Sequence, residues 1–425
     1  MSRVFRRAAA IFAPALIVVA GSCDKIWGIS PRTLDPNLVC EESGCRCAEG
    51  FDDCDGDQSN GCEADLQKAP ESCGTCGTRC NNGACDGGAC QCKSGFGDCD
   101  GDRSNGCETS ITDDPSSCGA CGHDCLGALC NNGRCAPTVL AKLYAPTSLA
   151  LDDGYLYIGS CDTPALQRVP VRGGTPQSMY EGQGCVRAMA VDQGSLYFAT
   201  KDQILTMKLD GSSLPSLVVD APGVSGVIGV IGGHVYWREQ SDLNYLNRFS
   251  SAKGLEADLG DDNFPFHAFS LTPKGVYWAG VQTILYLPHS KTATMSLATV
   301  QSDPTKGVPA FTIDAAHAYW AEPMSSVIKT VPIGGGATSV LTSASQPTSF
   351  FVDTASLYWT DAGSGDVRVV ALGAPNAKSS LVAVGQEIVS DSRIIGDEEA
   401  VYWFTVGAIT PGSGSNTGKI WRATK

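Results

Sequence analysis

The residues most capable of chemistry in this sequence are two short acidic runs that repeat each other. Their alternating carboxylates offer the oxygen ligands that calcium prefers, and the six aspartates concerned are Asp53, Asp55, Asp57, Asp98, Asp100 and Asp102. The helix–loop–helix calcium pattern is not met, because Gln58 stands where it needs glycine and Ala64 where it needs glutamate. The alternative is an acidic turn between cysteines. Calcium is therefore the one cofactor that the sequence suggests.

The 21 cysteines are the second reactive group, and 18 of them fall between Cys40 and Cys135. The C-x-x-C spacings that start at Cys73 and Cys118 favour zinc or redox chemistry in a cytosolic protein, but disulfides in an exported one. Their pairings cannot be assigned from spacing and stay open. Outside this region, Cys161 and Cys185 are predicted to form a disulfide, with two free thiols as the alternative.

No catalytic constellation is visible in the sequence. The five histidines stand in no H-x-x-x-H or H-E-x-x-H pattern, and no G-x-S-x-G motif occurs. The glycine-rich run 412–419 has neither the spacing nor the Ser or Thr of a phosphate loop. The net charge of −15 disfavours nucleic acid as a partner, since an acidic surface repels phosphates. We therefore expect neither enzymatic activity nor nucleic-acid binding.

Residues 40–135 contain the acidic runs and most cysteines, and they form a tandem repeat with a 45-residue period. The segments 45–80 and 90–125 match at 21 of 36 positions, including every cysteine. Few large apolar residues occur here, so disulfides are expected to replace a hydrophobic core. The run 45–51, CRCAEGF, resembles the C-x-C-x-x-G-F hairpin of epidermal-growth-factor-like (EGF-like) modules. The whole region is similar to cysteine-rich repeats of secreted bacterial proteins.

Residues 136–425 repeat a short apolar strand centred on tyrosine. The tyrosines are separated by 40, 39, 41, 42, 39 and 44 residues, and they are Tyr157, Tyr197, Tyr236, Tyr277, Tyr319, Tyr358 and Tyr402. A period near forty residues is the length of a four-stranded propeller blade. The predicted fold is therefore all-β, a seven-bladed β-propeller, with six blades as the alternative. The aromatic residues are expected to pack between blades rather than to bind a ligand.

The two ends of this region predict how the ring closes. The last repeat stops after its third strand, at 420–424, and has no outer strand. The segment 138–143 has the pattern of an outer strand and no repeat of its own. We expect it to complete the last blade, because closure removes the open sheet edges that invite aggregation.

The run 357–361, LYWTD, matches the YWTD signature of low-density-lipoprotein-receptor type propellers. The other six copies keep the tyrosine and lose the Thr-Asp pair. The resemblance implies a β-propeller and an extracellular binding role, although that family usually has six blades.

Charged residues just after the Tyr-Trp strands form the candidate ligand face. In a four-stranded meander these positions lie on the same side as Cys161, and they are Arg238, Glu239, Glu322 and Asp361. The expected ligand is a protein, a peptide or a glycan. Two other functions stay open: a lyase or hydrolase with a site in the central channel, and a purely structural surface protein.

The N-terminus predicts export and lipid anchoring. Residues 1–22 are typical of a signal peptide, with an apolar run at 8–20 that is too short for a permanent membrane span. The run 20–23, AGSC, resembles the bacterial lipobox, which implies cleavage before Cys23 and acylation of that residue. Residues 23–39 are then a lipidated tether. The expected location is the cell envelope, at the outer membrane or the surface of a Gram-negative cell.

Overall fold

The computed structural model describes residues 35–41, 44–57, 60–102, 104–161, 165–182, 184–239, 246–256, 268–290, 294–302, 307–390, 392–406 and 418–425. Within these ranges the chain is all-β, with 38 strands and no helix. The signal peptide, Cys23 and most of the tether lie outside the described residues. Contacts divide the chain into two compact units, Met1–Ile111 and Thr112–Lys425, so the boundary falls inside the second copy of the tandem repeat.

The first unit is built from short hairpins. Each pairs two neighbouring strands, and the strands are β1 (Leu38–Glu41), β2 (Gly44–Cys47), β3 (Phe51–Asp52), β4 (Ala64–Asp65), β5 (Gly83–Asp86), β6 (Ala89–Cys92), β7 (Phe96–Gly97) and β8 (Thr109–Ser110). The buried apolar residues of this unit, within the described ranges, are all half-cystines: Cys62, Cys73, Cys80, Cys85 and Cys107. The small core is therefore made of cross-links.

Six disulfides lie within the first unit. They are Cys40–Cys45, Cys47–Cys62, Cys54–Cys76, Cys73–Cys85, Cys80–Cys90 and Cys92–Cys107. Two of these pairings recur 45 residues later in the second unit, as Cys118–Cys130 and Cys125–Cys135. Cys99 and Cys121 are disulfide-bonded as well. The repeat in the sequence is thus a repeat of cross-links, which the cysteine spacing alone left open.

The second unit holds the hairpin of β9 (Cys130–Asn131) and β10 (Arg134–Cys135), followed by seven four-stranded antiparallel sheets. We call these sheets blades 1 to 7. Blades 1 to 3 contain β12 (Pro146–Asp152), β13 (Tyr155–Ser160), β14 (Leu166–Pro170), β15 (Gln177–Tyr180); β16 (Ala188–Asp192), β17 (Ser195–Ala199), β18 (Gln203–Lys208), β19 (Ser216–Asp220); and β20 (Val224–Ile231), β21 (His234–Glu239), β22 (Leu246–Ser250), β23 (Gly254–Glu256).

Blades 4 to 7 continue the same order of strands, from the central channel outward. They contain β24 (Phe269–Thr272), β25 (Gly275–Ala279), β26 (Thr283–Pro288), β27 (Met295–Thr299); β28 (Phe311–Ile313), β29 (His317–Glu322), β30 (Val327–Pro332), β31 (Ser339–Ser343); β32 (Pro347–Val352), β33 (Ser356–Asp361), β34 (Asp366–Ala371), β35 (Ser380–Ala383); and β36 (Ile394–Gly396), β37 (Ala400–Thr405), β38 (Gly418–Thr424), β11 (Thr138–Leu143).

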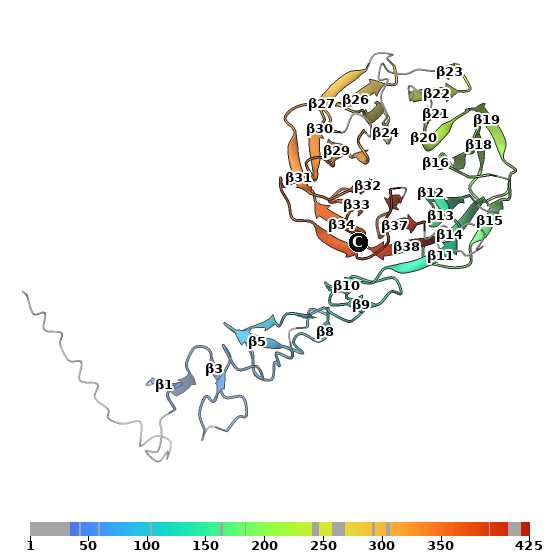
Figure 1. Cartoon of the computed structure of the whole chain (residues 1–425). Coiled ribbons are helices and arrows are strands. Elements are labelled where there is room, and N and C mark those ends of the chain that lie inside the picture. Colours follow the sequence, from blue (N-terminus) through green and yellow to red (C-terminus); the bar gives the residue numbers. More distant parts are fainter. Residues whose placement is uncertain are drawn as a thin grey trace, which may run out of the picture. The chain divides into compact units, whose positions relative to one another are not determined.

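The ring closes through strands from both ends of the second unit. β11 pairs with β38 in the seventh blade, with Thr138 opposite Arg422 and Leu143 opposite Gly418, and Figure 1 shows the two strands side by side. The inner strands β12 and β36 also contact each other. The predicted seven blades and the predicted closure are both confirmed, and the six-bladed alternative is wrong.

Aromatic side chains fill the seams between blades, as expected. The tyrosine of each second strand shares a buried cluster with the residue that follows the corresponding tyrosine in the next blade. These pairs are Tyr157 with Phe198, Tyr197 with Trp237, Tyr236 with Trp278, Tyr277 with Trp320, Tyr319 with Trp359, Tyr358 with Trp403 and Tyr402 with Ile158. Adjacent strand residues point to opposite faces of a sheet. The tyrosine and the tryptophan of one strand therefore pack in the two seams on opposite sides of their blade.

Three arginines join neighbouring blades by a shared geometry. Arg168, Arg248 and Arg422 each donate Nη1 to a carbonyl just beyond the third strand of the next blade, namely Leu209 (2.9 Å), His289 (3.2 Å) and Val171 (3.0 Å). Arg422 also donates Nη2 to the carbonyl of Leu126 at 2.7 Å. The arginine of the closing blade thereby ties the segment 112–135 to the propeller.

Candidate functional site

Glu322, one of the predicted ligand residues, is fully buried at the end of β29. Its Oε1 accepts hydrogen bonds from the Gln301 amide (3.2 Å) and from Nε1 of Trp320 (3.1 Å). Its Oε2 lies 2.8 Å from Nζ of Lys329. These contacts join the end of the second strand to the loop that enters the blade. Glu322 is therefore a structural residue.

Asp361 ends β33 in the equivalent position of the next blade and is 1% exposed. Its carboxylate accepts four backbone amides at 3.0 to 3.2 Å, those of Ser345, Gln346, Gly363 and Ser364. The prediction that Glu322 and Asp361 contact a ligand is thus corrected: a loop returns over each carboxylate and uses it as an acceptor.

The two buried carboxylates support a groove on the same side of the propeller. We call it the strand-end groove, and it has a volume of about 550 Å³. It is lined by Gly307, Pro309, Pro323, Met324, Gln346, Pro347, Thr348, Ala362 and Ser390. Glu322 directly precedes Pro323 and Met324, and Asp361 directly precedes Ala362. Met324 is 73% exposed, so a large apolar side chain is presented to solvent over a fixed base.

The central channel adjoins this groove. Its cavity of about 240 Å³ is lined by the inner strands of all seven blades, and Pro309 and Thr348 belong to both linings. Among the described residues of the two linings, Arg393 is the one charged side chain. The Nη1 of Arg393 donates to the carbonyls of Ser390 and Ser392, both at 3.3 Å. Because Ser390 also lines the groove, Arg393 stands where groove and channel meet.

The other two predicted ligand residues, Arg238 and Glu239, are half-buried at the end of β21. Glu239 pairs with Val224 and Trp237 with Ile228, so Arg238 stands opposite a bulge whose Gly226 and Val227 line the channel. Burial and the positive charge of Arg393 lower the pKa of Arg238 to about 10. The side-chain amide Nδ2 of Asn247 donates a hydrogen bond to Oε2 of Glu239 at 3.1 Å. Both side chains are therefore partly enclosed at the end of the strand.

Two further cavities open at the hairpin turns between first and second strands. One, of about 620 Å³ between blades 5 and 6, includes Asp314 and Tyr319; the other, of about 550 Å³ between blades 1 and 2, includes Arg168. The hydroxyl of Tyr319 donates to Asp314 at 2.7 Å, and burial raises the pKa of Tyr319. The Tyr319–Asp314 bond thus closes the hairpin of blade 5, whereas Arg168 links blade 1 to blade 2 through the Leu209 carbonyl.

The acidic runs form two equivalent clusters. In the first, Asp53, Asp55 and Glu63 bring carboxylate oxygens within 4.8 Å of one another, and Asp98, Asp100 and Glu108 repeat this arrangement. Glu63 and Glu108 thus take the places expected of Asp57 and Asp102. Asp53 accepts the Gly56 amide (2.7 Å) and Asp55 the Asp57 amide (2.8 Å), as in a tight acidic turn. Calcium binding stays a prediction.

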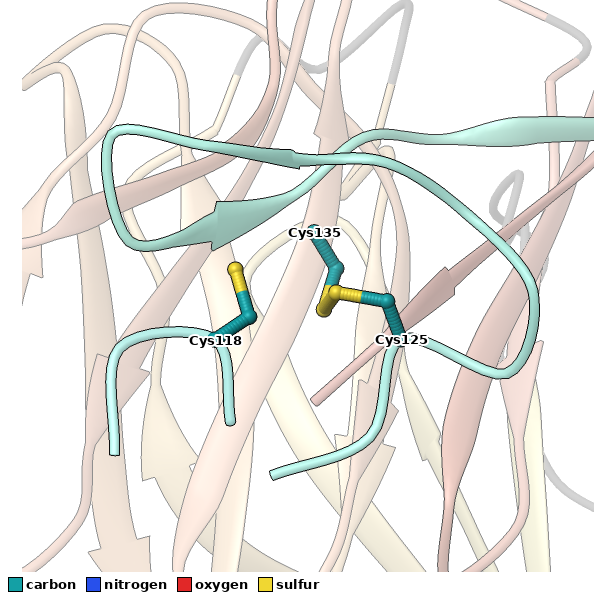
Figure 2. A group of neighbouring side chains, drawn as sticks. All are labelled: Cys118, Cys125 and Cys135. Carbon is teal, nitrogen blue, oxygen red and sulfur yellow. A yellow bond between two sulfur atoms is a disulfide. The ribbon is translucent and has the colours of Figure 1, made fainter. Parts of the chain in front are cut away.

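The cysteines with C-x-x-C spacing are occupied in disulfides. Figure 2 shows the grouping of Cys118, Cys125 and Cys135, in which a bond joins Cys125 to Cys135; Cys118 is bonded to Cys130. Thiolates are the form that binds zinc, so this grouping is not a zinc site. Cys161 and Cys185 also form a disulfide, between the loops after β13 and after β15.

Sequence reasoning missed Met324 and Arg393. Neither residue recurs with the tyrosine period. Each lies in a loop between strands, and the packing of that loop against a neighbouring loop puts it in a cavity lining. The one signal available was proline: Pro309, Pro323 and Pro347 all flank inner or second strands on this side. Proline fixes the backbone of such loops.

The lipid site Cys23 and the signal peptide lie outside the described residues. Across the part of the chain that the structure describes, no helix has the length and apolar character needed to cross a membrane.

Comparison with known proteins identifies the fold. No protein-family model matches the sequence, and no curated protein does. Among solved structures, a streptogramin B lyase is 10% identical, with a TM-score of 0.52 over 68% of this chain and 97% of that chain. An inactive virginiamycin B lyase from Staphylococcus aureus with quinupristin is 12% identical, with a TM-score of 0.51 over 68% and 98%. The WD40 repeats of RRP9 are 12% identical, with a TM-score of 0.50 over 68% and 98%. Likeness at this level shows a β-propeller.

Proposed function

We propose that this chain is a lipid-anchored protein of the cell envelope whose propeller binds a protein, peptide or glycan through the strand-end groove, without catalysing a reaction. The observation that carries the proposal is the exposed side chain of Met324 above a groove held by Glu322 and Asp361. Binding sites are concave and mostly apolar, with a few placed polar groups. The strand-end groove has this composition.

The base of the strand-end groove is held in place by Glu322 and Asp361, and a preformed base favours ligand binding. Seven hydrogen bonds and one ion pair fix the two carboxylates, including a bond of 3.3 Å from Nε1 of Trp359 to Asp361. A preformed site loses less conformational entropy when a ligand binds. Methionine adapts its shape to different apolar partners. A fixed base with an adaptable contact residue suits the recognition of a macromolecule.

A lyase or hydrolase in the central channel is the alternative, because two lyases share the fold. General acid–base catalysis needs a titratable group within hydrogen-bond reach of the substrate. The described lining of the channel supplies hydroxyls, apolar side chains and Arg393. This lining supports binding better than proton transfer.

The binding proposal is tested by two matched substitutions in the full chain. Met324→Glu places a charge in the groove, whereas Met295→Glu places one on the outer strand β27, where Met295 is 49% exposed. Immobilised wild type and both variants are probed with a peptide-display library and a glycan array. Met324→Glu should lose the ligands that the wild type retains, and Met295→Glu should keep them. Equal retention by both variants would refute the groove as the binding site.

The anchor is tested separately. Expression of the full chain in a Gram-negative host, followed by mass spectrometry of the N-terminal peptide, should show Cys23 as the first residue and carrying acyl groups. Cys23→Ser should abolish this modification and move the protein out of the membrane fraction. An unmodified Cys23 in the wild type contradicts lipid anchoring and leaves the groove unaffected.

A further inference from the structure

The residue opposite the blade tyrosine on the third strand is an arginine in blades 1, 3 and 7. The pairs are Tyr157 with Arg168, Tyr236 with Arg248 and Tyr402 with Arg422. Side chains of directly opposite residues in antiparallel strands are neighbours on one face of the sheet. Each of these arginines donates across its seam to a carbonyl just beyond the third strand of the next blade. A guanidinium group is therefore a recurring component of the seams.

Blade 5 has the tyrosine and aspartate of blade 7 but no arginine opposite the tyrosine. In blade 7 the hydroxyl of Tyr402 donates to Asp397 at 2.9 Å. In blade 5 the hydroxyl of Tyr319 donates to Asp314 at 2.7 Å. Both aspartates also accept the backbone amides two and three residues further along the chain. Opposite Tyr319 stands Thr330, so the two blades differ in the residue that reaches into the seam.

The cavity of about 620 Å³ between blades 5 and 6 lies beside this threonine. Asp314, Tyr319 and Thr330 line it, and so does Leu372. Leu372 directly follows the third strand of blade 6, which is the position of the carbonyl that each seam arginine contacts in its neighbour. Among the described residues that line the cavity, Asp314 is the one carboxylate, and neither lysine nor arginine occurs. The equivalent cavity between blades 1 and 2 is lined by Arg168 and Lys208.

Two polar groups of this seam lack the partners that an arginine supplies elsewhere. Oγ1 of Thr330 is buried and has no hydrogen-bond partner within the described part of the chain. The equivalent Thr206 of blade 2 donates its Oγ1 to the Leu196 carbonyl at 3.1 Å. No described group donates to the carbonyl of Leu372. Buried polar groups are normally paired, so a donor from outside the chain suits this seam.

The seam between blades 6 and 7 shows that a carboxylate at this place takes a cation. Asp353 accepts the amides two and three residues further along, as Asp314 does. Nζ of Lys425 lies 2.7 Å from Oδ2 of Asp353 and 5.4 Å from the ring centre of Tyr358, the tyrosine of blade 6. A carboxylate that already caps a turn therefore still pairs with a cation in this fold.

We propose that the cavity between blades 5 and 6 binds a guanidinium group from outside the chain, in the place that an arginine of the chain fills in three other seams. The guanidinium donates to the carboxylate of Asp314, to Oγ1 of Thr330 and to the carbonyl of Leu372. Guanidinium has five N–H donors and no acceptor, which matches a site made of acceptors. Leu341 and Pro375 also line the cavity and cover the methylene stem of the ligand.

This site is separate from the strand-end groove. It opens at the hairpin turns between first and second strands, and its lining shares no residue with that of the groove. Two sources supply the same chemistry: an arginine side chain of a polypeptide, and free arginine. The net charge of −15 attracts either cation to the protein.

The test uses the full chain and small guanidinium probes. N-acetyl-L-arginine amide and L-arginine are titrated by calorimetry at constant ionic strength. N-acetyl-L-citrulline amide, which has the same shape without the charge, is the reference. We expect saturable binding of the arginine probes and about tenfold weaker binding of the citrulline probe, because charge-assisted hydrogen bonds are the stronger ones. Tighter binding of the amide than of L-arginine indicates a polypeptide ligand, and the reverse indicates the free amino acid.

A matched pair of variants locates the binding. Asp314→Asn should weaken it about tenfold, through the loss of the charged acceptor. Asp397→Asn removes the same turn contacts from blade 7 and should bind as the wild type. Binding that falls equally in both variants, or equal binding of the arginine and citrulline probes, overturns the inference. So does the absence of saturable binding.

Thr330→Arg tests the same site by filling it. Its own guanidinium should reach the Leu372 carbonyl as the other seam arginines reach theirs. We expect this variant to melt at the wild-type temperature or above and to bind no probe. Probe binding at wild-type strength in Thr330→Arg contradicts the inference, and if the variant does not fold, Asp314→Asn and Asp397→Asn decide. The proposed function rests on Met324 and stands or falls separately.

Discussion

The two compact units of the chain are stabilised by different interactions. In the first, the buried apolar residues within the described ranges are half-cystines, and six disulfides lie among short hairpins. In the propeller, tyrosine and tryptophan side chains fill seven seams. A regular spacing of one residue type can therefore encode either cross-links or packing. Covalent bonds serve where the chain has too few apolar residues to form a core.

Reduction should give the largest difference between the units. Removal of a native disulfide costs a small domain about 2–5 kcal/mol, and six are lost together from the first unit. We expect residues 35–111 to lose amide protection in dithiothreitol while the propeller strands keep theirs. Hydrogen exchange with mass spectrometry measures both in one sample. Persisting protection across 35–111 after full reduction would show that packing, not cross-linking, holds that unit.

In the propeller, the substitution Trp359→Ala should lower the free energy of unfolding nearly as much as the loss of a disulfide does in the first unit. Trp359 is fully buried in the seam between blades 5 and 6, and Trp→Ala substitutions in cores cost about 3–5 kcal/mol. Trp421→Ala is the matched control, because Trp421 is half-buried beside Trp403 on β38. Urea denaturation at constant m-value should show a clearly smaller loss for the control. Similar losses would contradict the assignment of stability to the seams.

The hydrogen bonds that hold the loops beneath the groove should contribute less to the free energy of unfolding than one seam aromatic does. Asp361→Asn keeps the size of the side chain but weakens its acceptors for four backbone amides. Leaving buried donors poorly paired costs about 1–3 kcal/mol. Asp210→Asn in blade 2 is the control, since Asp210 is exposed and its carboxylate caps a turn by accepting from Ser212. An unchanged free energy of unfolding for Asp361→Asn would show that the loops are stable without this carboxylate.

The smallest effect concerns pH and the acidic clusters of the repeats. The amides of Asp57 and Asp102, aided by Asn60 and Asn105, hold the pKa values of Asp55 and Asp100 below the ordinary 3.8. A carboxyl with a lowered pKa in the folded state stabilises it above the unfolded pKa. That stabilisation disappears as the pH falls through the folded value. We therefore expect both clusters intact at pH 4 and lost only below the ordinary pKa. Carboxyl-carbon NMR titration checks this, and midpoints at or above 3.8 contradict it.

The architecture was predictable because its determinants are periodic. The spacing of Tyr157 to Tyr402 reflects the seams, and the unmatched outer strand at 138–143 predicted the closing blade. Side-chain roles at single positions were harder. Glu322 and Asp361 follow strands and carry charge, which indicates exposure unless a loop returns over them. Met324 and Arg393 share no period, and only the packing of separate loops places them in the linings of the groove and the channel. Disulfide pairings were hidden because spacing does not determine them.

We propose that the partner contacts the side of the propeller where the second strands end. The most direct measurement places a photo-crosslinking amino acid at Met324, and in a parallel strain at Met295, in cells that produce the full chain. We expect a light-dependent crosslinked species from position 324 and none from position 295. Crosslinks of equal strength from both positions, or from position 295 alone, would contradict it.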